Sequence, residues 1–136
     1  YLKNKIKNYF FLTNCDIMVN TNYFDILNFH LKKKNDITIV VAKKTFNLPY
    51  GVCNVEKKNF QFIEKPKFRF NVNVGLYLLS KNILNLLKKK QYLDFNTLLE
   101  KSLKNNKKVG YYKIKDRDWV DVGRMDKYKN FLEKKI

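Results

Sequence analysis

Residues 37–42 read ITIVVA, a run of β-branched and apolar side chains without a charge. Successive side chains of a strand point to opposite faces of a sheet, so an unbroken run of this kind indicates a strand covered on both faces. Such strands occur where helices pack on both sides of a sheet. The stretch therefore favours an α/β fold with a buried strand at Ile37–Ala42.

The segments before this strand predict one strand and one helix. Tyr9–Thr13 has the apolar character of a short strand, and Asn14-Cys15-Asp16 follows at its C-terminal edge. Asn22–Lys34 has apolar residues near helical spacing and a lysine-rich last turn, which suits the negative end of a helix dipole. The chain thus alternates strand and helix from its start.

The segments after Ile37–Ala42 continue the alternation. Gly51–Val55 and Phe60–Glu64 flank four polar residues, which is the pattern of a hairpin. Ser80 and Asp94 are expected to cap helices. The remaining elements are expected at Asn73–Leu79 (strand), Ser80 to about Lys90 (helix), Asp94 to about Asn106 (helix), Val109–Ile114 (strand), Trp119–Gly123 (short extended segment) and Met125–Lys135 (closing helix). The predicted fold class is α/β, with a mixed, mostly parallel sheet and flanking helices.

Composition limits the class of protein. The chain has 136 residues, of which 45% are hydrophobic, so it forms one domain or part of one and can bury a core. No apolar run approaches the roughly 20 residues of a membrane-spanning helix, and no signal peptide is apparent, so we expect a cytoplasmic protein without membrane insertion. Cys15 and Cys53 are expected to be reduced thiols.

The net charge of +17 raises nucleic acid as a partner, but the kind of basic residue argues against it. Only Arg69, Arg117 and Arg124 are arginines, and the other 26 of the 29 basic residues are lysines. Readers of bases and clamps on phosphate rely on the rigid fork of arginine. The lysines are also scattered in short groups, so we expect solvated positions and no nucleic acid.

Two carboxylates are candidates for a metal site, because open α/β sheets bind ligands beyond the C-terminal ends of their strands. Asp16 follows the first strand, and Asp121 shares one face of an extended segment with Trp119 and Gly123. If the two carboxylates converge, they suit Mg²⁺, which takes oxygen ligands and leaves room for phosphates. The alternative for Asp16 is an aspartate that caps a turn, and the spacing alone does not decide between them.

Two further clusters contain groups that could contact a ligand. Glu64 can accept hydrogen bonds from hydroxyls, and Lys65 offers a charge for phosphate, although a surface ion pair at a strand end is the alternative. Gly75 lies inside a predicted strand, and Gly51 leaves a similar gap before the hairpin. A glycine in such a place indicates a bulge or the close approach of a backbone or ligand, with a turn glycine as the alternative.

Taken in order, these segments resemble the sugar-phosphate nucleotidylyltransferase family, which includes the mannose-1-phosphate guanylyltransferases and the glucose-1-phosphate thymidylyltransferases. The matching stretches are PYGV at 49–52, FIEKP at 62–66, VNVGLY at 72–77, WVDVG at 119–123 and GRMDKY at 123–128. Each is weak alone, but their order and spacing extend the resemblance from Tyr9 to Phe131. The last stretch is most similar to the bacterial branch linked to lipopolysaccharide and surface-sugar synthesis, whose members often carry regulatory modules upstream.

The resemblance implies a Rossmann-like nucleotide-diphospho-sugar transferase fold. It also implies a reaction in which a sugar 1-phosphate attacks the α-phosphorus of a nucleoside triphosphate and pyrophosphate leaves. Asp16 and Asp121 would hold the catalytic Mg²⁺, and Lys65 would bind the phosphate of the sugar 1-phosphate. These three are the implied catalytic residues.

The resemblance implies a sugar pocket as well. Glu64 and Asn73 would bind hydroxyls, while Gly51 and Gly75 would let the backbone approach the sugar. We expect Glu64, Asn73 and the backbone at Gly51 to line one concavity, and the two carboxylates to lie on the same side of the sheet as Glu64 and Lys65.

One part of the family pattern has no counterpart in this sequence. The family opens with a strand and a glycine- and arginine-containing loop that binds the triphosphate, whereas all four glycines here come later, at positions 51, 75, 110 and 123. We therefore expect residues 1–136 to be the C-terminal part of the catalytic domain, inactive alone and either marginally stable or associating with further copies of itself. Cys15 stands where the family often has glycine and keeps a small residue there. His30 is expected to pack or to lie on the surface.

Two other functional classes stay open at this point. A catalytically inactive sugar- or nucleotide-sugar-binding regulatory remnant would keep Gly51 and Gly75 but need not keep both Asp16 and Asp121. A basic nucleic-acid module would want clustered arginine and exposed aromatic side chains.

Overall fold

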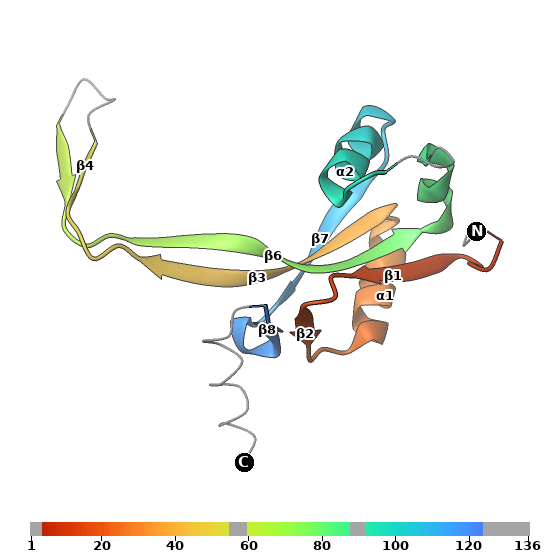
Figure 1. Cartoon of the computed structure of the whole chain (residues 1–136), viewed down its shortest axis with the longest axis horizontal. Coiled ribbons are helices and arrows are strands. Elements are labelled where there is room, and N and C mark those ends of the chain that lie inside the picture. Colours follow the sequence, from red (N-terminus) through yellow and green to blue (C-terminus); the bar gives the residue numbers. More distant parts are fainter. Residues whose placement is uncertain (1–3, 55–59, 88–91, 124–136) are drawn as a thin grey trace, which may run out of the picture.

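The computed structural model describes residues 4–54, 60–87 and 92–123, in which a four-stranded sheet carries helices on both faces (Figure 1). The elements in chain order are β1 Tyr9–Thr13, β2 Ile17–Val19, α1 Tyr23–Lys33, β3 Ile37–Asn47, β4 Val52–Asn54, β5 Gln61–Ile63, β6 Lys67–Ser80, η1 Lys81–Leu86, α2 Phe95–Lys104, β7 Val109–Ile114, η2 Asp116–Asp118 and β8 Trp119–Asp121. The expected helix at Met125–Lys135 and the end of the GRMDKY stretch lie outside the described residues.

The sheet has the strand order β1-β6-β3-β7, and only the β3–β7 pair is parallel. The expectation of a mostly parallel sheet is therefore wrong. The chain leaves β3, turns through the β4–β5 hairpin and returns as β6 beside β3, which makes this pair antiparallel. The connection from β6 through α2 then brings β7 alongside β3 in the same direction.

Two cores, one on each face of the sheet, explain the unbroken apolar run at 37–42. On one face, Ile26 of α1 packs with Val40 and Leu76, among other side chains. On the opposite face, Leu98 of α2 packs with Leu79 and its neighbours. Because the strand side chains alternate, both faces of β3 and β6 need apolar residues. The predicted double coverage of the strand at 37–42 is confirmed.

Both α-helices begin at a side-chain cap, of which the one at Asp94 was predicted as a cap and Asn22 only as the start of its helix. The side chain of Asn22 accepts a hydrogen bond from the Phe24 amide (3.0 Å), and that of Asp94 accepts one from the Thr97 amide (2.7 Å). The hydrogen bond from the Thr97 backbone amide is also the main cause of the lowered pKa of the Asp94 carboxyl group.

Ser80 does not cap an α-helix, which corrects the prediction for this segment. Its hydroxyl donates to the Asn35 carbonyl (3.2 Å) and lies 3.0 Å from His30 Nε2, so it is engaged elsewhere. The segment that follows is the 3₁₀ helix η1, which ends at Leu86 and not near Lys90.

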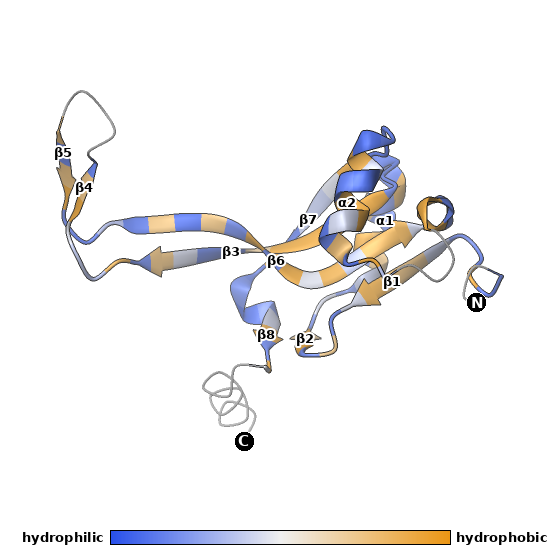
Figure 2. Cartoon of the chain, turned by 45° about the horizontal axis from the view of Figure 1, so that its top comes forward, coloured by the Kyte–Doolittle hydropathy of each residue, from blue (hydrophilic) through white to orange (hydrophobic). Residues whose placement is uncertain are grey.

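Beyond the body of the molecule, β3 and β6 continue as a two-stranded ribbon that we call the arm, residues 43–47 paired with 67–71 (Figure 1). Its end carries the predicted hairpin, in which β4 and β5 pair. The rings of Phe46, Phe68 and Phe70 gather together, with centroids 6.0 Å apart for the Phe46–Phe70 pair and 6.4 Å for the Phe68–Phe70 pair. Apolar and polar residues alternate along the ribbon, as Figure 2 shows.

Two expectations from the composition concern thiols and membranes. Cys15 and Cys53 are free and exposed. Within the described parts of the chain, no helix is long and apolar enough to cross a membrane.

His30 packs inside the protein, which is one of the two roles expected for it. Its side chain is 1% exposed, with Nδ1 2.8 Å from the Thr38 hydroxyl and Nε2 3.0 Å from the Ser80 hydroxyl. Burial lowers the pKa of His30, because the charged imidazolium loses its hydration, while the nearby Asp36 charge acts in the opposite direction. The neutral ring is therefore the form that the fold stabilises.

We expect the free energy of unfolding to fall as the pH drops below 6.5, the ordinary pKa of histidine. The unfolded chain then binds a proton at His30 that the folded chain resists, so stability is full above this value and is lost down to the lowered pKa. Urea unfolding between about pH 5 and pH 8 measures the effect. The sequence has one histidine, so His30→Gln, which keeps an amide between the two hydroxyls, should remove the dependence. An equal slope in the variant would contradict this assignment.

Candidate metal and substrate site

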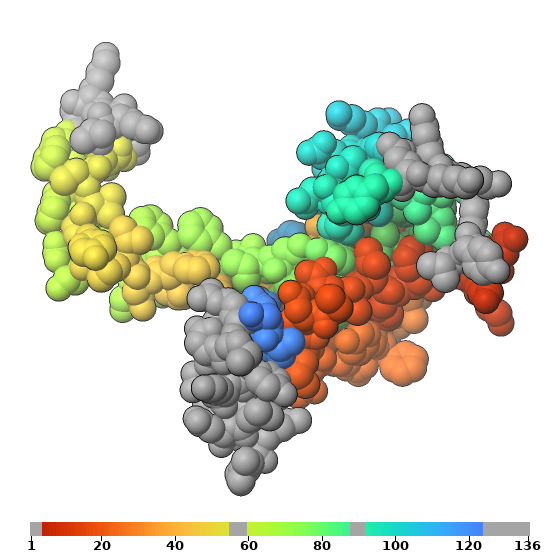
Figure 3. All heavy atoms as spheres, in the orientation of Figure 1, coloured from red at the N-terminus to blue at the C-terminus, as the bar shows by residue number. Residues whose placement is uncertain are grey.

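Asp16 and Asp121, which the sequence only suggested as partners, lie next to each other in the fold. Asp16 precedes β2 and Asp121 ends β8, and these two strands pair so that Ile17 is opposite Asp121. The amide of Val122 donates to the Asp16 carbonyl at 2.9 Å. Figure 3 shows the blue β8 segment against the red-to-orange β1–β2 segment. The short β2–β8 ladder thus joins the two carboxylates.

Both carboxylates face the bare backbone of Gly123. Asp16 Oδ2 and Asp121 Oδ1 lie 3.2 Å and 3.3 Å from the point where a Cβ atom of Gly123 would stand. The Gly123 amide donates to Asp121 Oδ1 (3.2 Å), which fixes that side chain. The missing side chain therefore leaves a small cradle between two anionic groups.

A shallow depression of about 160 Å³ opens beside this pair, and it is lined by Asn14, Asp16, Ile17, Asn73, Val74, Gly75, Trp119 and Asp121. Trp119 and Asp121 share the lining, as expected for alternate residues of an extended segment. No third acidic, histidine or cysteine side chain joins the two carboxylates within the described residues. Two carboxylates with open space suit Mg²⁺, which keeps several waters and takes phosphate oxygens as its other ligands.

Gly75 forms a bulge in β6 at the floor of this depression. The register of β3 and β6 passes from Ile39 opposite Tyr77 to Val41 opposite Asn73, and Gly75 adopts a φ of 84° between them. Asn73 stabilises the bulge, because its Oδ1 accepts from the Gly75 amide (2.9 Å) and its Nδ2 donates to the Tyr77 hydroxyl (2.7 Å). The prediction of a bulge at Gly75 is confirmed.

The bulge also fastens the end of β1. The Asn14 amide donates to the Gly75 carbonyl (2.9 Å), and the Asn14 side chain fills the space where a Cβ atom of Gly75 would lie. Sequence reasoning gave Asn14 no role and missed β2 altogether. The three apolar residues of β2 are too short a run to be distinguished from a turn.

The residues expected on the sugar side lie at the end of the arm. A Cβ atom at Gly51 would meet Glu64 Oε2 at 2.9 Å, so Gly51 and Glu64 are neighbours. Lys65 Nζ lies 3.8 Å from Glu64 Oε1 with both side chains more than half exposed, which is the geometry of a surface ion pair.

The structure does not bring Glu64, Lys65 and Gly51 to Asn73 or to the carboxylate pair. The strand β6 runs without interruption from Lys67 to Asn73, a distance of roughly 20 Å at the usual rise per residue. Figure 1 accordingly shows the β4 end of the arm far from β2 and β8. The expectation that Glu64, Asn73 and Gly51 line one concavity is wrong for this structure.

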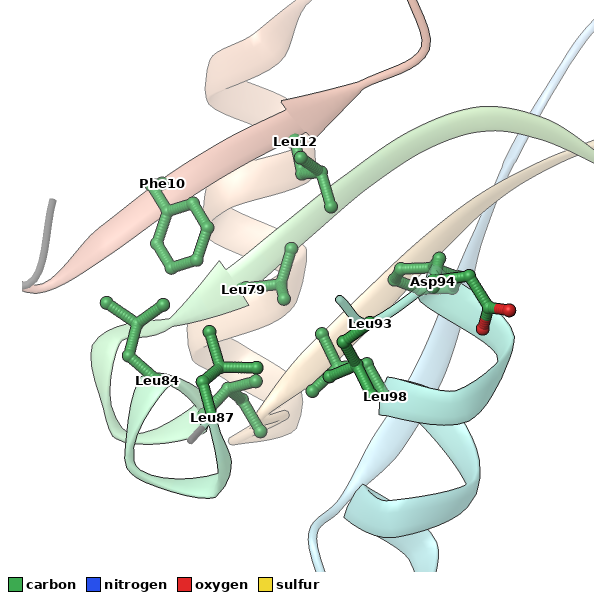
Figure 4. A pocket seen from close by; sticks show the side chains of 10 residues that line it. Phe10, Leu12, Leu79, Leu84, Leu87, Leu93, Asp94 and Leu98 are labelled. Atoms are coloured by element: carbon green, nitrogen blue, oxygen red, sulfur yellow. The ribbon is translucent and has the colours of Figure 1, made fainter. Parts of the chain in front are cut away.

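A larger pocket of about 330 Å³ lies elsewhere, between β1, η1 and α2 (Figure 4). Its lining is apolar except for Asp94, and that carboxylate already caps α2. The pocket therefore offers hydrophobic contact but no free polar group, and the chemistry belongs to the carboxylate site.

Comparison with known proteins gives a consistent result. The family profile described as "Nucleotidyl transferase" matches residues 1–135. The chain is 28% identical over 128 residues to the "Probable mannose-1-phosphate guanylyltransferase 3" of Arabidopsis thaliana, covering 88% of this chain and 37% of that protein. It is 30% identical over 129 residues to the mannose-1-phosphate guanyltransferase of Schizosaccharomyces pombe, covering 88% of this chain and 34% of that protein.

A solved structure shares the fold. HddC from Yersinia pseudotuberculosis matches with a TM-score of 0.67 at 20% identity, over 99% of this chain and 59% of that chain. The chain spans about a third of the length of the two curated relatives.

We expect Gly75→Ala to lower the free energy of unfolding by about 1–3 kcal/mol, the usual cost of a positive φ combined with a displaced neighbour. The added methyl group would stand 2.8 Å from the side-chain nitrogen Nδ2 of Asn14. Urea unfolding measures the loss. Gly110→Ala would meet the side-chain amide of Asn35 more closely still but at an ordinary φ, so its loss of stability measures a steric contact without backbone strain. An unchanged stability of Gly75→Ala would contradict the role given to the bulge.

Proposed function

Because the chain belongs to the nucleotidyl transferase family, we propose that it forms the metal- and sugar-phosphate-binding part of an enzyme that makes nucleotide sugars. The reaction joins a sugar 1-phosphate to a nucleoside triphosphate and releases pyrophosphate. The relatives are mannose-1-phosphate guanylyltransferases, so mannose 1-phosphate and GTP are the first substrates to test. The observation that carries the proposal is the approach of Asp16 and Asp121 at Gly123.

Asp16 and Asp121 would hold a Mg²⁺ ion, since the donors are carboxylate oxygens and the site leaves room for water and phosphate. When bound, the ion neutralises charge on the phosphates as pyrophosphate leaves. The chain's own groups position the reactants, which is the main requirement of an in-line phosphoryl transfer. Trp119 lines one side of the depression.

Asn73 is the residue of this site best placed to bind a sugar hydroxyl. Its amide uses one hydrogen and one lone pair on Tyr77 and Gly75, which leaves one donor and one acceptor free. The side chain is held in the bulge, so a hydroxyl would meet a fixed partner. Gly51, Glu64 and Lys65 stay predictions as sugar-phosphate ligands, because they lie on the arm.

We also propose surface polysaccharide or lipopolysaccharide synthesis as the use of the product and the cytoplasm as the compartment. Both rest on sequence resemblance alone. A second candidate function is a catalytically inactive sugar- or nucleotide-sugar-binding remnant. It is favoured by the distance between the arm and the carboxylate pair, because such a remnant would not need the arm residues and the carboxylates in one site.

Metal binding can be measured with Mn²⁺, which quenches nearby tryptophan fluorescence. Trp119 is the one tryptophan of the sequence and lines the depression. We expect Asp16→Asn and Asp121→Asn each to weaken binding at least about tenfold, since each removes one of two anionic ligands. Glu100→Gln, an exposed site on α2, removes the same charge and should change little. Equal effects of all three variants would argue against the site.

Gly123→Ala tests the cradle itself. The added methyl group would lie 3.2 Å and 3.3 Å from the two carboxylate oxygens, so it should weaken Mn²⁺ binding without a charge change. The free energy of unfolding should change by less than about 1 kcal/mol, because Gly123 is exposed. Retention of full affinity would place the ion away from Gly123.

Turnover is tested by pyrophosphate release from mannose 1-phosphate with GTP and with each other nucleoside triphosphate. We expect none from the 136-residue chain alone, because the sequence has no glycine-rich loop for the triphosphate. Addition of the preceding segment of a related mannose-1-phosphate guanylyltransferase should give activity, and Asp121→Asn should abolish it. Turnover by the chain alone would mean that the nucleotide site is misplaced. If the chain mixed with the added segment shows no turnover but still binds Mn²⁺, the catalytically inactive binding remnant is the favoured function.

A further inference from the structure

Three side chains from separate elements meet at the edge of the carboxylate site. Lys44 Nζ of β3 stands 4.7 Å from the centre of the Trp119 ring. Asp116 Oδ1 lies 3.5 Å from the same ammonium nitrogen and accepts a hydrogen bond from Trp119 Nε1 at 3.2 Å. The indole is therefore held by a cation over its face and by an anion at its N–H edge. We call this arrangement the Lys44 clamp.

The strand that carries Asp121 needs such an anchor. The ladder of β2 and β8 has three residue pairs and is separate from the four-stranded sheet. A two-stranded ladder of this length is marginal on its own. Trp119 opens β8, two residues before Asp121, and packs against the core on the α1 face. Trp119 thus links β8 to the core.

Lys44 is well placed to provide the anchor. It follows the buried half of β3, just past Ala42, which pairs with the last residue of β7. The chain leaves the sheet at that point and passes through η2 to β8. The Lys44 side chain is 23% exposed, so the ammonium is partly desolvated and its attraction to the ring and to Asp116 exceeds that of an open surface pair.

We propose that Lys44 is a positioning residue for the metal site: with Asp116 it fixes the Trp119 ring and thereby holds Asp121 opposite Asp16. The proposal rests on the proposed function, because it assumes that these carboxylates bind a divalent cation. It assigns the lysine a role through Trp119, without contact to substrate.

Electrostatics alone predicts the opposite result, which makes the proposal testable. Loss of an ammonium group near a cation site removes a repulsion and should strengthen Mn²⁺ binding. Loss of the clamp should weaken it, because β8 no longer holds Asp121 in place. Lys113 provides a matched control: its Nζ stands 5.5 Å from the Tyr111 ring on the neighbouring β7, in a contact of the same kind.

The experiment compares Lys44→Met, Lys44→Arg and Lys113→Met in the full chain by Mn²⁺ quenching of Trp119. We expect Lys44→Met to weaken binding by about three- to tenfold, in line with the loss of a cation–ring contact and its ion pair. Lys44→Arg keeps the charge over the ring and should restore most of the affinity. Lys113→Met should leave it unchanged or slightly stronger. Unchanged or tighter binding in Lys44→Met would overturn the proposal.

A metal-free measurement separates failure of the clamp from failure of the metal site. The rate constant for acrylamide quenching of Trp119 should at least double in Lys44→Met and in Asp116→Asn, and should not change in Lys113→Met. If the wild-type chain binds no Mn²⁺ but shows this pattern, the metal assignment fails while the clamp stands as an anchor of β8. If the quenching does not change in Lys44→Met, the clamp is wrong whatever the metal result. Circular dichroism confirms that each variant is folded.

Discussion

The backbone conformation of Gly75 is the constraint on which the arrangement of the strands depends. Its positive φ lets Val74, Gly75 and Leu76 occupy the space opposite Val40. After this bulge, β6 contributes side chains to both cores, and before it the strand forms part of the arm. The carbonyl exposed by the bulge accepts the Asn14 amide, so the same distortion sets the end of β1 and the start of the carboxylate site. A residue with a Cβ atom at position 75 would disturb both the bulge in β6 and the attachment of β1.

Local features of the fold were predictable because they depend on short-range chemistry. The run at 37–42 indicated double coverage, and Asn22 and Asp94 marked helix starts that the structure confirms. Strand direction was not predictable in this way, because burial on both faces is also reached by an antiparallel pair when helices cover each side. Ser80 shows a second limit: its hydroxyl was free to cap in sequence terms, but His30 and Asn35 compete for it in the fold.

In the candidate site, too, local features were predictable and long-range contacts were not. Asp16 was identifiable as a residue after a strand and Asp121 as one in an extended segment, yet their approach depends on β2, whose three residues gave no clear signal. Lys44 and Asp116 looked like two of many solvated charges, because nothing in their spacing indicates that both reach Trp119. Glu64 was expected to share a concavity with Asn73, but β6 begins at Lys67 and the arm separates the two residues. The alternation of lysine, arginine and phenylalanine at the start of β6 continues the ribbon.

The strand order also has a consequence for the time course of folding. Pairing of β3 with β6 can grow outward from the β4–β5 hairpin, because each new pair closes a loop only slightly longer than the last. Pairing of β1 with β6 joins Thr13 to Leu76 and requires the closure of a much longer loop. The arm and the inner sheet are thus expected to form early, and β1 to dock late. Since Asp16 follows β1 in the chain, the carboxylate pair would be among the last features to assemble.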